Sequence, residues 1–335
     1  MRKIKVVQIG TGHDHAPASM KTLRLLDDLF EVLGYVFVND GEQSIENEKN
    51  PCFSGIKKLT LEEAFAISDL DAVVIETDDS LLTKYASLAL RRGLAVQMDK
   101  PGSQSIKEFN ETFDYAYKNH LVIHTGYMYR YNPAIKKALS LIKSGEIGDV
   151  YSIEAQMSCN LLPYKRAWLK NFKGGMINFL GCHLIDLILQ IMGEPKQVVP
   201  LSSVSRLDLG GEDVGFAVLK YDNCTATVKT NCMEAGGPMR RKLVVVGEKG
   251  TIEVNPIEYP IENRELYSDI RVALSKNDTW YYRPEPETFG PFHRYREMFT
   301  EFSKIVNGEI ENPYSYEYEK TLHSVLIKAC GGLDE

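Results

Sequence analysis

Hydrophobic positions over the first 125 residues alternate between two spacings. Residues 4–9 form a short apolar run ending at Gly10, typical of a buried strand, and helical spacing follows at Met20, Leu23, Leu26 and Phe30. The same alternation predicts strands over 32–38, 72–75, 95–98 and 121–124, and helices over 61–67, 82–92 and 106–119. Strands alternating with helices predict an α/β domain with a doubly wound parallel sheet, which we assign to residues 1–125.

The pattern changes after about residue 149. A helical stretch over 175–192 precedes strand-like runs over 198–204, 214–219, 225–232, 243–246 and 251–254. In the run over 214–219, Val214, Phe216 and Val218 alternate with Gly215, Ala217 and Leu219. This alternation predicts a strand with one face packed against helices and the other face partly exposed. We therefore predict an α+β domain with an open, largely antiparallel sheet over 126–335. Two closing helices, over 292–306 and 317–330, would cover this sheet or return to the first domain.

Composition and charge narrow the class of protein. With 335 residues, 44% hydrophobic and 25% charged, two globular domains are expected. The net charge of −7 argues against nucleic acid or an anionic membrane, which need a positive surface, and favours a small-molecule partner. The run at 4–9 is too short and polar for a signal peptide, and no stretch approaches the roughly 20 apolar residues of a membrane span, so a cytoplasmic protein is expected. The six cysteines contain no Cys-x-x-Cys pair, which indicates reduced thiols.

The turn Gly10-Thr11-Gly12 carries the first chemical signal. Glycines two apart after a strand let the backbone approach a pyrophosphate, whose charge then lies at a helix N-terminus, so nucleotide binding is favoured over a structural turn. His15 replaces the third glycine of this fingerprint, which predicts a different loop or a helix that stands off the strand. His13 and His15 have no carboxylate or cysteine partner at ligand spacing. No metal site is predicted, and both are expected to face solvent or contact phosphate.

Two further segments point to a dinucleotide. Asn39 and Asp40 follow the second predicted strand and are candidates for binding the adenosine ribose, although slightly late, because Phe37 stands where the acid is usual. Segment 37–44 has no Arg or Lys for a 2′-phosphate, which favours NAD over NADP. Asp99-Lys100-Pro101 follows the strand over 95–98, so Lys100 is expected to face the cofactor crevice and to hold or help deprotonate a substrate hydroxyl.

These motifs resemble, in order, those of the Gfo/Idh/MocA oxidoreductase family. The resemblance rests on residues 6–12, 71–77, 99–101, 126–133, 174–186 and 246–251 and covers nearly the whole chain. It implies an N-terminal Rossmann domain and a C-terminal α+β domain whose open sheet commonly forms the oligomer interface, here of a homodimer or homotetramer. It also implies hydride exchange between NAD(P) and a carbohydrate-like polyol.

The resemblance implies roles for individual residues. Lys100 matches the family's active-site lysine, with Asp99 in place of Glu, and His183 matches its catalytic histidine. Thr77 and Asp79 match the family's cofactor loop. Arg130 matches the arginine that comes after the strand following the Lys100 motif. With the candidates above, the predicted cofactor-binding set is Gly10, Thr11, Gly12, His13, His15, Asn39, Asp40, Thr77, Asp79, Asp99, Lys100 and Arg130.

Aromatic residues provide the substrate candidates. Tyr164 and Trp168 precede a Gly-Gly pair in a polar loop, where they either stack on a sugar face or pack within the domain. Tyr127, Tyr129 and Tyr131 alternate in a strand-like segment and are expected to share one face near Arg130. The predicted substrate-binding set is Tyr127, Tyr164, Trp168, Asn178 and His183.

Departures from the family pattern leave three hypotheses open. Phe179 stands where the family has an Asp four residues before His183, and Asp186 is either a partner of that histidine or structural. Asp78 and Leu82 replace the Pro and His of the cofactor loop. The leading hypothesis is an NAD-dependent dehydrogenase or reductase for a sugar, inositol or sugar acid. The others are a redox-neutral NAD-dependent glycosidase or lyase, and a nucleotide-binding protein with reduced catalysis, for which Phe179 is the main argument.

Overall fold

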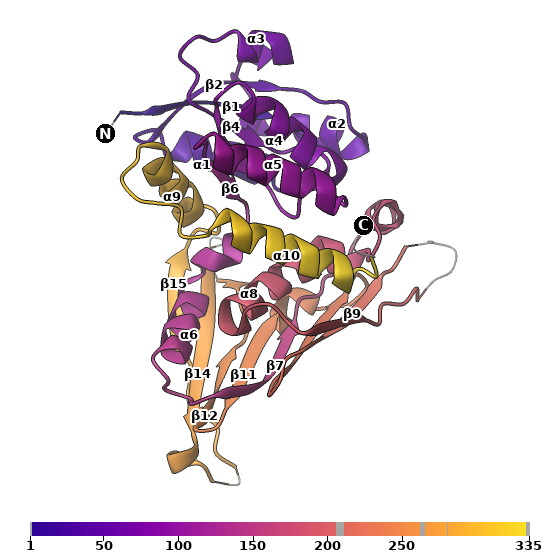
Figure 1. The fold of residues 1–335 in the computed structure, drawn as a ribbon, viewed down its shortest axis with the longest axis vertical. Helices are drawn as coiled ribbons and strands as arrows, with labels where there is room; N and C mark the ends of the chain where they lie inside the picture. The colour runs from indigo at the N-terminus through magenta and orange to yellow at the C-terminus, as the bar shows by residue number, and fades with distance from the viewer. Residues whose placement is uncertain (1, 206–210, 262–264, 280, 333–335) are drawn as a thin grey trace. The chain divides into compact units, whose positions relative to one another are not determined.

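The computed structural model describes residues 2–205, 211–261, 265–279 and 281–332. Figure 1 shows the path of the chain and labels its larger helices and strands. The chain divides into two compact units. The first comprises Met1–Tyr127 and Tyr295–His323, and the second comprises Met128–Arg294 and Ser324–Glu335.

The first unit contains a parallel sheet of six strands within the described residues, in the order β3-β2-β1-β4-β5-β6. The predicted doubly wound sheet is confirmed. Strand order reverses between β1 and β4, so the crevice in which open α/β sheets bind ligands lies beyond the carboxyl ends of these two strands. The strands are β1 (Ile4–Ile9), β2 (Phe30–Val36), β3 (Lys58–Leu59), β4 (Ala72–Ile75), β5 (Ala95–Met98) and β6 (Ile123–Thr125).

Apolar side chains at helical spacing pack the helices of this unit onto its sheet. Phe109 and Phe113 of α5 stack with ring centroids 4.4 Å apart and join one buried cluster with β1, β4 and α4. Phe299 of α9 meets Phe30 edge-on at 6.1 Å. The helices are α1 (Ala16–Leu25), α2 (Glu42–Glu48), α3 (Leu61–Phe65), α4 (Leu82–Leu90), α5 (Ile106–Lys118), α9 (Arg296–Val306) and α10 (Tyr316–Ala329) as far as His323, with 3₁₀ turns η1 (Pro51–Phe53) and η2 (Asp79–Leu81).

The beginning of α10 belongs to the first unit through specific contacts. The hydroxyl of Tyr316 donates to the carbonyl of Leu121 at 2.6 Å, and the ring of His323 stacks on Phe109 at 3.9 Å, almost parallel. The helix expected over 292–306 begins only at Arg296, because residues up to Phe292 form the strand β15.

The second unit contains a mixed, mostly antiparallel sheet of nine strands within the described residues. The order is β13-β14-β12-β11-β7-β10-β9-β8, and β15 also pairs with β14. Only β7 and β10 run parallel among these described pairs, so the predicted largely antiparallel sheet is confirmed. The strands are β7 (Val150–Gln156), β8 (Gln197–Pro200), β9 (Val214–Lys220), β10 (Thr225–Asn231), β11 (Lys242–Gly247), β12 (Gly250–Val254), β13 (Tyr259–Pro260), β14 (Leu266–Leu274) and β15 (Glu287–Phe292).

One face of this sheet is packed and the other is partly exposed. On β9, Gly215, Ala217 and Leu219 are buried, whereas the interleaved Val214, Phe216 and Val218 are only half-buried, as their alternation predicts. Figure 1 shows α6 and α8 lying over the strands. The helical segments are η3 (Met128–Tyr131), α6 (Pro133–Lys143), α7 (Pro163–Trp168), η4 (Leu169–Asn171), a π-helical turn (Ile177–Gly181), α8 (Cys182–Met192), η6 (Gly237–Arg240) and η8 (Ser275–Asn277).

The strand-like interpretation of the tyrosine segment is wrong. Met128–Tyr131 form a 3₁₀ turn that leads into α6, whose first turn is capped by the Asn132 side chain accepting from the amide of Ile135. All four residues of the turn are buried, so alternation of residue type does not separate two faces there. No helix in the described ranges has both the length and the apolar character needed to cross a bilayer.

Candidate active site

The glycine turn lies directly after β1, in the first unit. Gly10 has φ +91°, and a Cβ there would lie 2.6 Å from Thr77 Cγ2 and from the Thr77 backbone nitrogen. A Cβ on Gly12 would lie 2.3 Å from Asp40 Oδ1. Both positions therefore require glycine, the first for conformation and both for space.

The loop after this turn differs from the usual short fingerprint, as His15 in place of glycine indicates. Helix α1 begins only at Ala16, after the whole motif. The buried Thr11 hydroxyl donates to the carbonyl of Ser44 at 3.0 Å, and the Asn47 amide donates to the carbonyls of Thr11 and His13 at 2.8 and 2.9 Å. Residues of helix α2 thus hold the loop in place by hydrogen bonds to Thr11 and His13.

Asp40 has one carboxylate oxygen to offer a ligand. Its Oδ2 accepts from the amide of Asp78 at 2.7 Å, whereas the buried Oδ1, which faces Gly12, has no hydrogen-bond partner among the described residues. Burial raises the pKa of Asp40, because the hydrogen bond from the Asp78 amide offsets only part of the cost of burying the charged carboxylate. A buried acceptor beside a glycine turn fits the ribose hydroxyls of a dinucleotide, so the residues present are compatible with this cofactor.

A cavity of about 670 Å³ opens beyond the carboxyl end of β2. Its lining includes the predicted Asn39, together with Phe37, Tyr85 and Lys58. The ammonium of Lys58 lies 4.3 Å from the centroid of the Phe37 ring and 2.6 Å from Glu48 Oε1. Sequence reasoning missed Lys58, because β3 brings it to β2 from outside the segment 37–44.

A buried cluster of charged groups lies where β1, β4 and β5 end. His13 Nε2 lies 3.2 Å from Asp79 Oδ1 and 3.1 Å from the carbonyl of Lys100. His13 Nδ1 lies 3.3 Å from Asp99 Oδ2 and 3.6 Å from Glu76 Oε2. All five residues are at most 3% exposed. The expectation that His13 faces solvent is therefore wrong, because three carboxylates distant in sequence enclose it.

His15 joins the same cluster. Its Nδ1 lies 3.0 Å from Asp99 Oδ2, its ring meets His13 edge-on at 4.7 Å, and Tyr295 covers it at 5.5 Å. The side chain is 15% exposed, so it is mostly buried as well. Thr77 is buried beside this cluster, and its hydroxyl donates to the carbonyl of Asp78 at 3.3 Å.

The cluster favours positive charge on His13. Burial lowers the pKa of His13, but the carboxylates of Asp99 and Asp79 outweigh burial and raise it to about 9. Burial lowers the pKa of His15, which favours the neutral ring. Burial opposes ionisation of Asp99, yet His13 and His15 hold its pKa below the ordinary value. Burial and the Asp99 charge raise the pKa of Glu76 well above its ordinary value, so Glu76 is the carboxyl that keeps its proton.

In the second unit, Arg130 is held by Asp186. The Arg130 Nε and Nη2 donate to Asp186 at 2.8 to 3.1 Å, both side chains are buried, and Gln190 also donates to this carboxylate at 3.0 Å. Asp186 is thus the partner of Arg130. His183, 1% exposed, meets the Tyr129 ring edge-on at 5.0 Å.

Phe179 belongs to an aromatic group in the second unit. Trp168 packs against Phe172 at 4.5 Å and edge-on against Phe179 at 5.6 Å, and the Lys165 ammonium lies 3.5 Å from the Trp168 ring centroid. These contacts favour packing within the unit as the role of Trp168. Tyr164 is 55% exposed, and Asn178 is buried.

A polar network beside His183 was not predicted from the sequence. The Tyr129 hydroxyl donates to Glu258 at 2.7 Å, Arg241 donates to Tyr129 and to Glu258 at 2.8 and 3.0 Å, and Arg294 binds Glu258 through two nitrogens. Burial opposes the charge of Glu258, but Arg294 and Arg241 hold its pKa below the ordinary value. These residues come from four separate segments, so no local spacing signals them.

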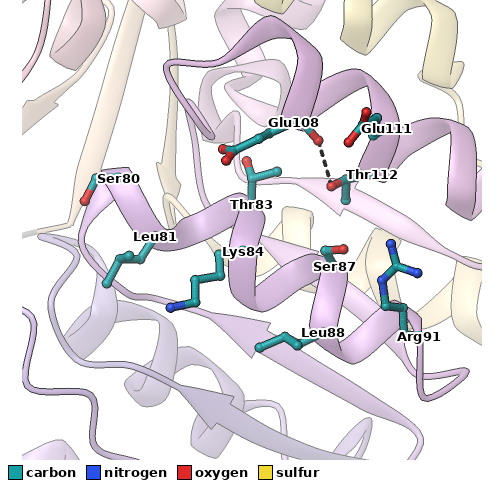
Figure 2. A pocket seen from close by; sticks show the side chains of 10 residues that line it. All are labelled: Ser80, Leu81, Thr83, Lys84, Ser87, Leu88, Arg91, Glu108, Glu111 and Thr112. Carbon is teal, nitrogen blue, oxygen red and sulfur yellow. Dashed lines mark hydrogen bonds between the residues drawn. The ribbon is translucent and has the colours of Figure 1, made fainter.

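The first unit has a second pocket. Figure 2 shows it between α4 and α5, with Lys84, Arg91, Glu108 and Glu111 among its lining. Its volume is about 420 Å³. The Thr112 hydroxyl donates to the carbonyl of Glu108 at 2.9 Å, one turn earlier in α5. The lining of this pocket contains none of the site residues predicted from the sequence.

Comparisons with known proteins agree with this fold. The model of the GFO/IDH/MocA C-terminal domain matches residues 135–253. The chain is 27% identical over 279 residues to D-xylose 1-dehydrogenase (NADP(+)) 2 of Haloferax volcanii, covering 81% of this chain and 82% of that protein.

Solved structures of similar fold include two oxidoreductases. One, from Thermotoga maritima, has a TM-score of 0.79 and 21% identity over 98% of this chain and 96% of its own. The other, the aldose-aldose oxidoreductase of Caulobacter crescentus, has a TM-score of 0.80 and 18% identity over 98% of each chain. These likenesses establish the fold.

Proposed function

We propose that this chain, which belongs to the GFO/IDH/MocA family of oxidoreductases, transfers a hydride between NAD(P) and a carbohydrate-like polyol. It is an enzyme of the dehydrogenase or reductase class. The observation that carries the proposal is the glycine turn after β1, with the unpaired Oδ1 of Asp40 facing Gly12 at the carboxyl edge of the sheet. The similarity to a xylose dehydrogenase supports the sugar-like class of substrate.

In this proposal the first unit holds the cofactor. The backbone of Gly10, Thr11 and Gly12 approaches the pyrophosphate, and Asp40 accepts from a ribose hydroxyl. The cavity beside Phe37 and Asn39 takes the adenosine end. When bound, the nicotinamide ring supplies the hydride acceptor or donor.

NAD is the preferred cofactor in this proposal. The Asp40 carboxylate suits ribose hydroxyls and disfavours a negatively charged 2′-phosphate. Lys58 is the cation that lines the adenosine cavity, but its ammonium is paired with Glu48 at 2.6 Å. Calorimetric titration checks this preference: NAD binds more tightly than NADP, and Asp40→Asn narrows the difference.

Lys100 follows β5 and has the role of orienting the substrate hydroxyl and assisting its deprotonation. Its main chain is fixed, because its amide donates to Asp99 Oδ1 at 2.7 Å and its carbonyl lies 3.1 Å from His13 Nε2. In the second unit, His183 is assigned the role of general base. Its ring is oriented by Tyr129, which the network of Glu258 and Arg241 holds in turn.

Turnover is tested by following the absorbance of reduced nicotinamide with a panel of sugars, inositols and sugar acids. We expect a net increase in the absorbance of reduced nicotinamide with NAD and at least one polyol. Release of product from a glycoside without such an increase would indicate the redox-neutral glycosidase or lyase instead. Nucleotide binding without turnover on any compound would indicate the binding protein.

We further propose that the open sheet of the second unit pairs two copies of the chain. Half-buried Val214, Phe216 and Val218 on β9 leave apolar surface on this face. A mass measurement in solution is expected to give a dimer or tetramer.

A further inference from the structure

We propose that His13, His15 and Asp99 form a binding site for a divalent transition-metal ion of the zinc class. The three side chains come from the loops after β1 and β5. Their ligand atoms all lie within 4.8 Å of one another. Sequence spacing offers these histidines no carboxylate, and only the parallel pairing of the sheet strands brings Asp99 to them.

The distances from Asp99 Oδ2 to the two imidazole nitrogens suit tetrahedral coordination. Bonds of about 2.0 to 2.2 Å place tetrahedral ligand atoms roughly 3.3 to 3.6 Å apart. Asp99 Oδ2 lies 3.3 Å from His13 Nδ1 and 3.0 Å from His15 Nδ1. Two imidazole nitrogens therefore converge on one carboxylate oxygen at separations that need to change by only a few tenths of an ångström.

The surroundings of His13 determine which nitrogen is available. Nε2 lies 3.1 Å from the Lys100 carbonyl and 3.2 Å from Asp79 Oδ1, both acceptors, so Nε2 carries the hydrogen. Nδ1 lies 3.2 Å from the amide nitrogen of His15 and faces oxygens of Asp99 and Glu76. These oxygens require a cation at Nδ1, and a metal ion bound there takes the place of a proton. Metal-bound histidines typically donate their other nitrogen to a carbonyl or carboxylate, as His13 does here.

The donor set also selects the class of ion. Two nitrogens and one oxygen select zinc-class ions over Mg²⁺ or Ca²⁺, which prefer oxygen ligands, and three protein ligands leave a position for water or substrate.

The experiment titrates the chelator-treated full chain with Zn²⁺ by calorimetry and with Co²⁺ by visible absorbance, without nucleotide. We expect one ion per chain and the visible bands of four-coordinate Co²⁺. His15→Gln and Asp99→Asn should each weaken binding at least tenfold, because each removes one of three ligands. His120→Asn is the matched control, since His120 is an exposed histidine of the same unit outside the cluster.

Circular dichroism checks that each variant is folded, and His15→Gln, at a partly exposed position, is the variant least disturbing to the core. Absence of stoichiometric binding by the parent chain would overturn the proposal, as would binding that a folded His15→Gln variant retains in full. Because no nucleotide is present, neither result depends on the proposed dehydrogenase activity.

Discussion

Replacing Gly12 by alanine is expected to weaken NAD binding while leaving the fold in place. A Cβ at this position would lie 2.3 Å from Asp40 Oδ1 and 2.6 Å from Oδ2, whereas ordinary contact begins at 3.4 Å. The carboxylate therefore has to withdraw by the difference, about 1.1 Å. That displacement breaks its 2.7 Å hydrogen bond from the amide of Asp78 and moves the oxygen assigned to the ribose.

The size of the effect follows from the group that is displaced. A hydrogen bond to a charged group contributes about 1.5 to 3 kcal/mol, and each 1.4 kcal/mol changes a dissociation constant about tenfold, so the Kd for NAD should rise roughly 10- to 100-fold. Calorimetry measures it directly. Gly55→Ala is the control: Gly55 has φ +76° and nothing within 4 Å of a Cβ, so it tests backbone strain without touching Asp40. A Gly12→Ala protein that binds NAD within twofold of the parent would refute the reasoning.

Three other experiments, with four substitutions, test separate parts of the structure. Lys100→Ala should slow hydride transfer in single turnover by about 10²- to 10⁴-fold while the Kd for NAD changes little; equal losses in both would make Lys100 a cofactor ligand instead. Burial lowers the pKa of His323 to about 4, below the ordinary 6.5, so the folded state resists protonation of this ring. The stability that depends on the neutral ring is fully present above pH 6.5, and about 3 kcal/mol of the free energy of unfolding is lost as pH falls toward 4. Urea unfolding should show this loss in the parent and a smaller one in His323→Gln, and equal losses would exclude His323 as the cause. Phe179→Asp should move the limb of the kcat/KM profile that reports the base to higher pH, and His183→Ala should abolish it; an unaltered profile in both would remove His183 from the mechanism.

The parallel strands were the most predictable elements. β1, β4 and β5 occupy the predicted ranges because strands buried on both faces appear as uninterrupted apolar runs. Helix α2 and strand β3 were missed, because the first is largely polar and the second has only two residues. Local periodicity also misled at Met128–Tyr131, where every side chain is buried and the alternation carries no information about faces.

The candidate site was predictable only where its signal is local. The glycine turn and Lys100 follow strands directly, so their positions could be inferred from spacing. The partners of His13 lie in loops 63 to 87 residues away, and only the sheet topology joins them. Asp186 lies 56 residues from Arg130, and Lys58 reaches the cavity beyond β2 through its pairing with Tyr35. Long-range electrostatics of this kind has no sequence period.

Transfer of a labelled hydride tests the central proposal most directly. The chain is incubated with NADH carrying deuterium at C4 of the nicotinamide and with a panel of keto-sugars and keto-inositols, and mass spectrometry follows the label. We expect deuterium on the carbinol carbon of at least one product, with loss of that transfer in Lys100→Ala. Tight nucleotide binding with no label in any product, or equal labelling by the parent and Lys100→Ala, would contradict it.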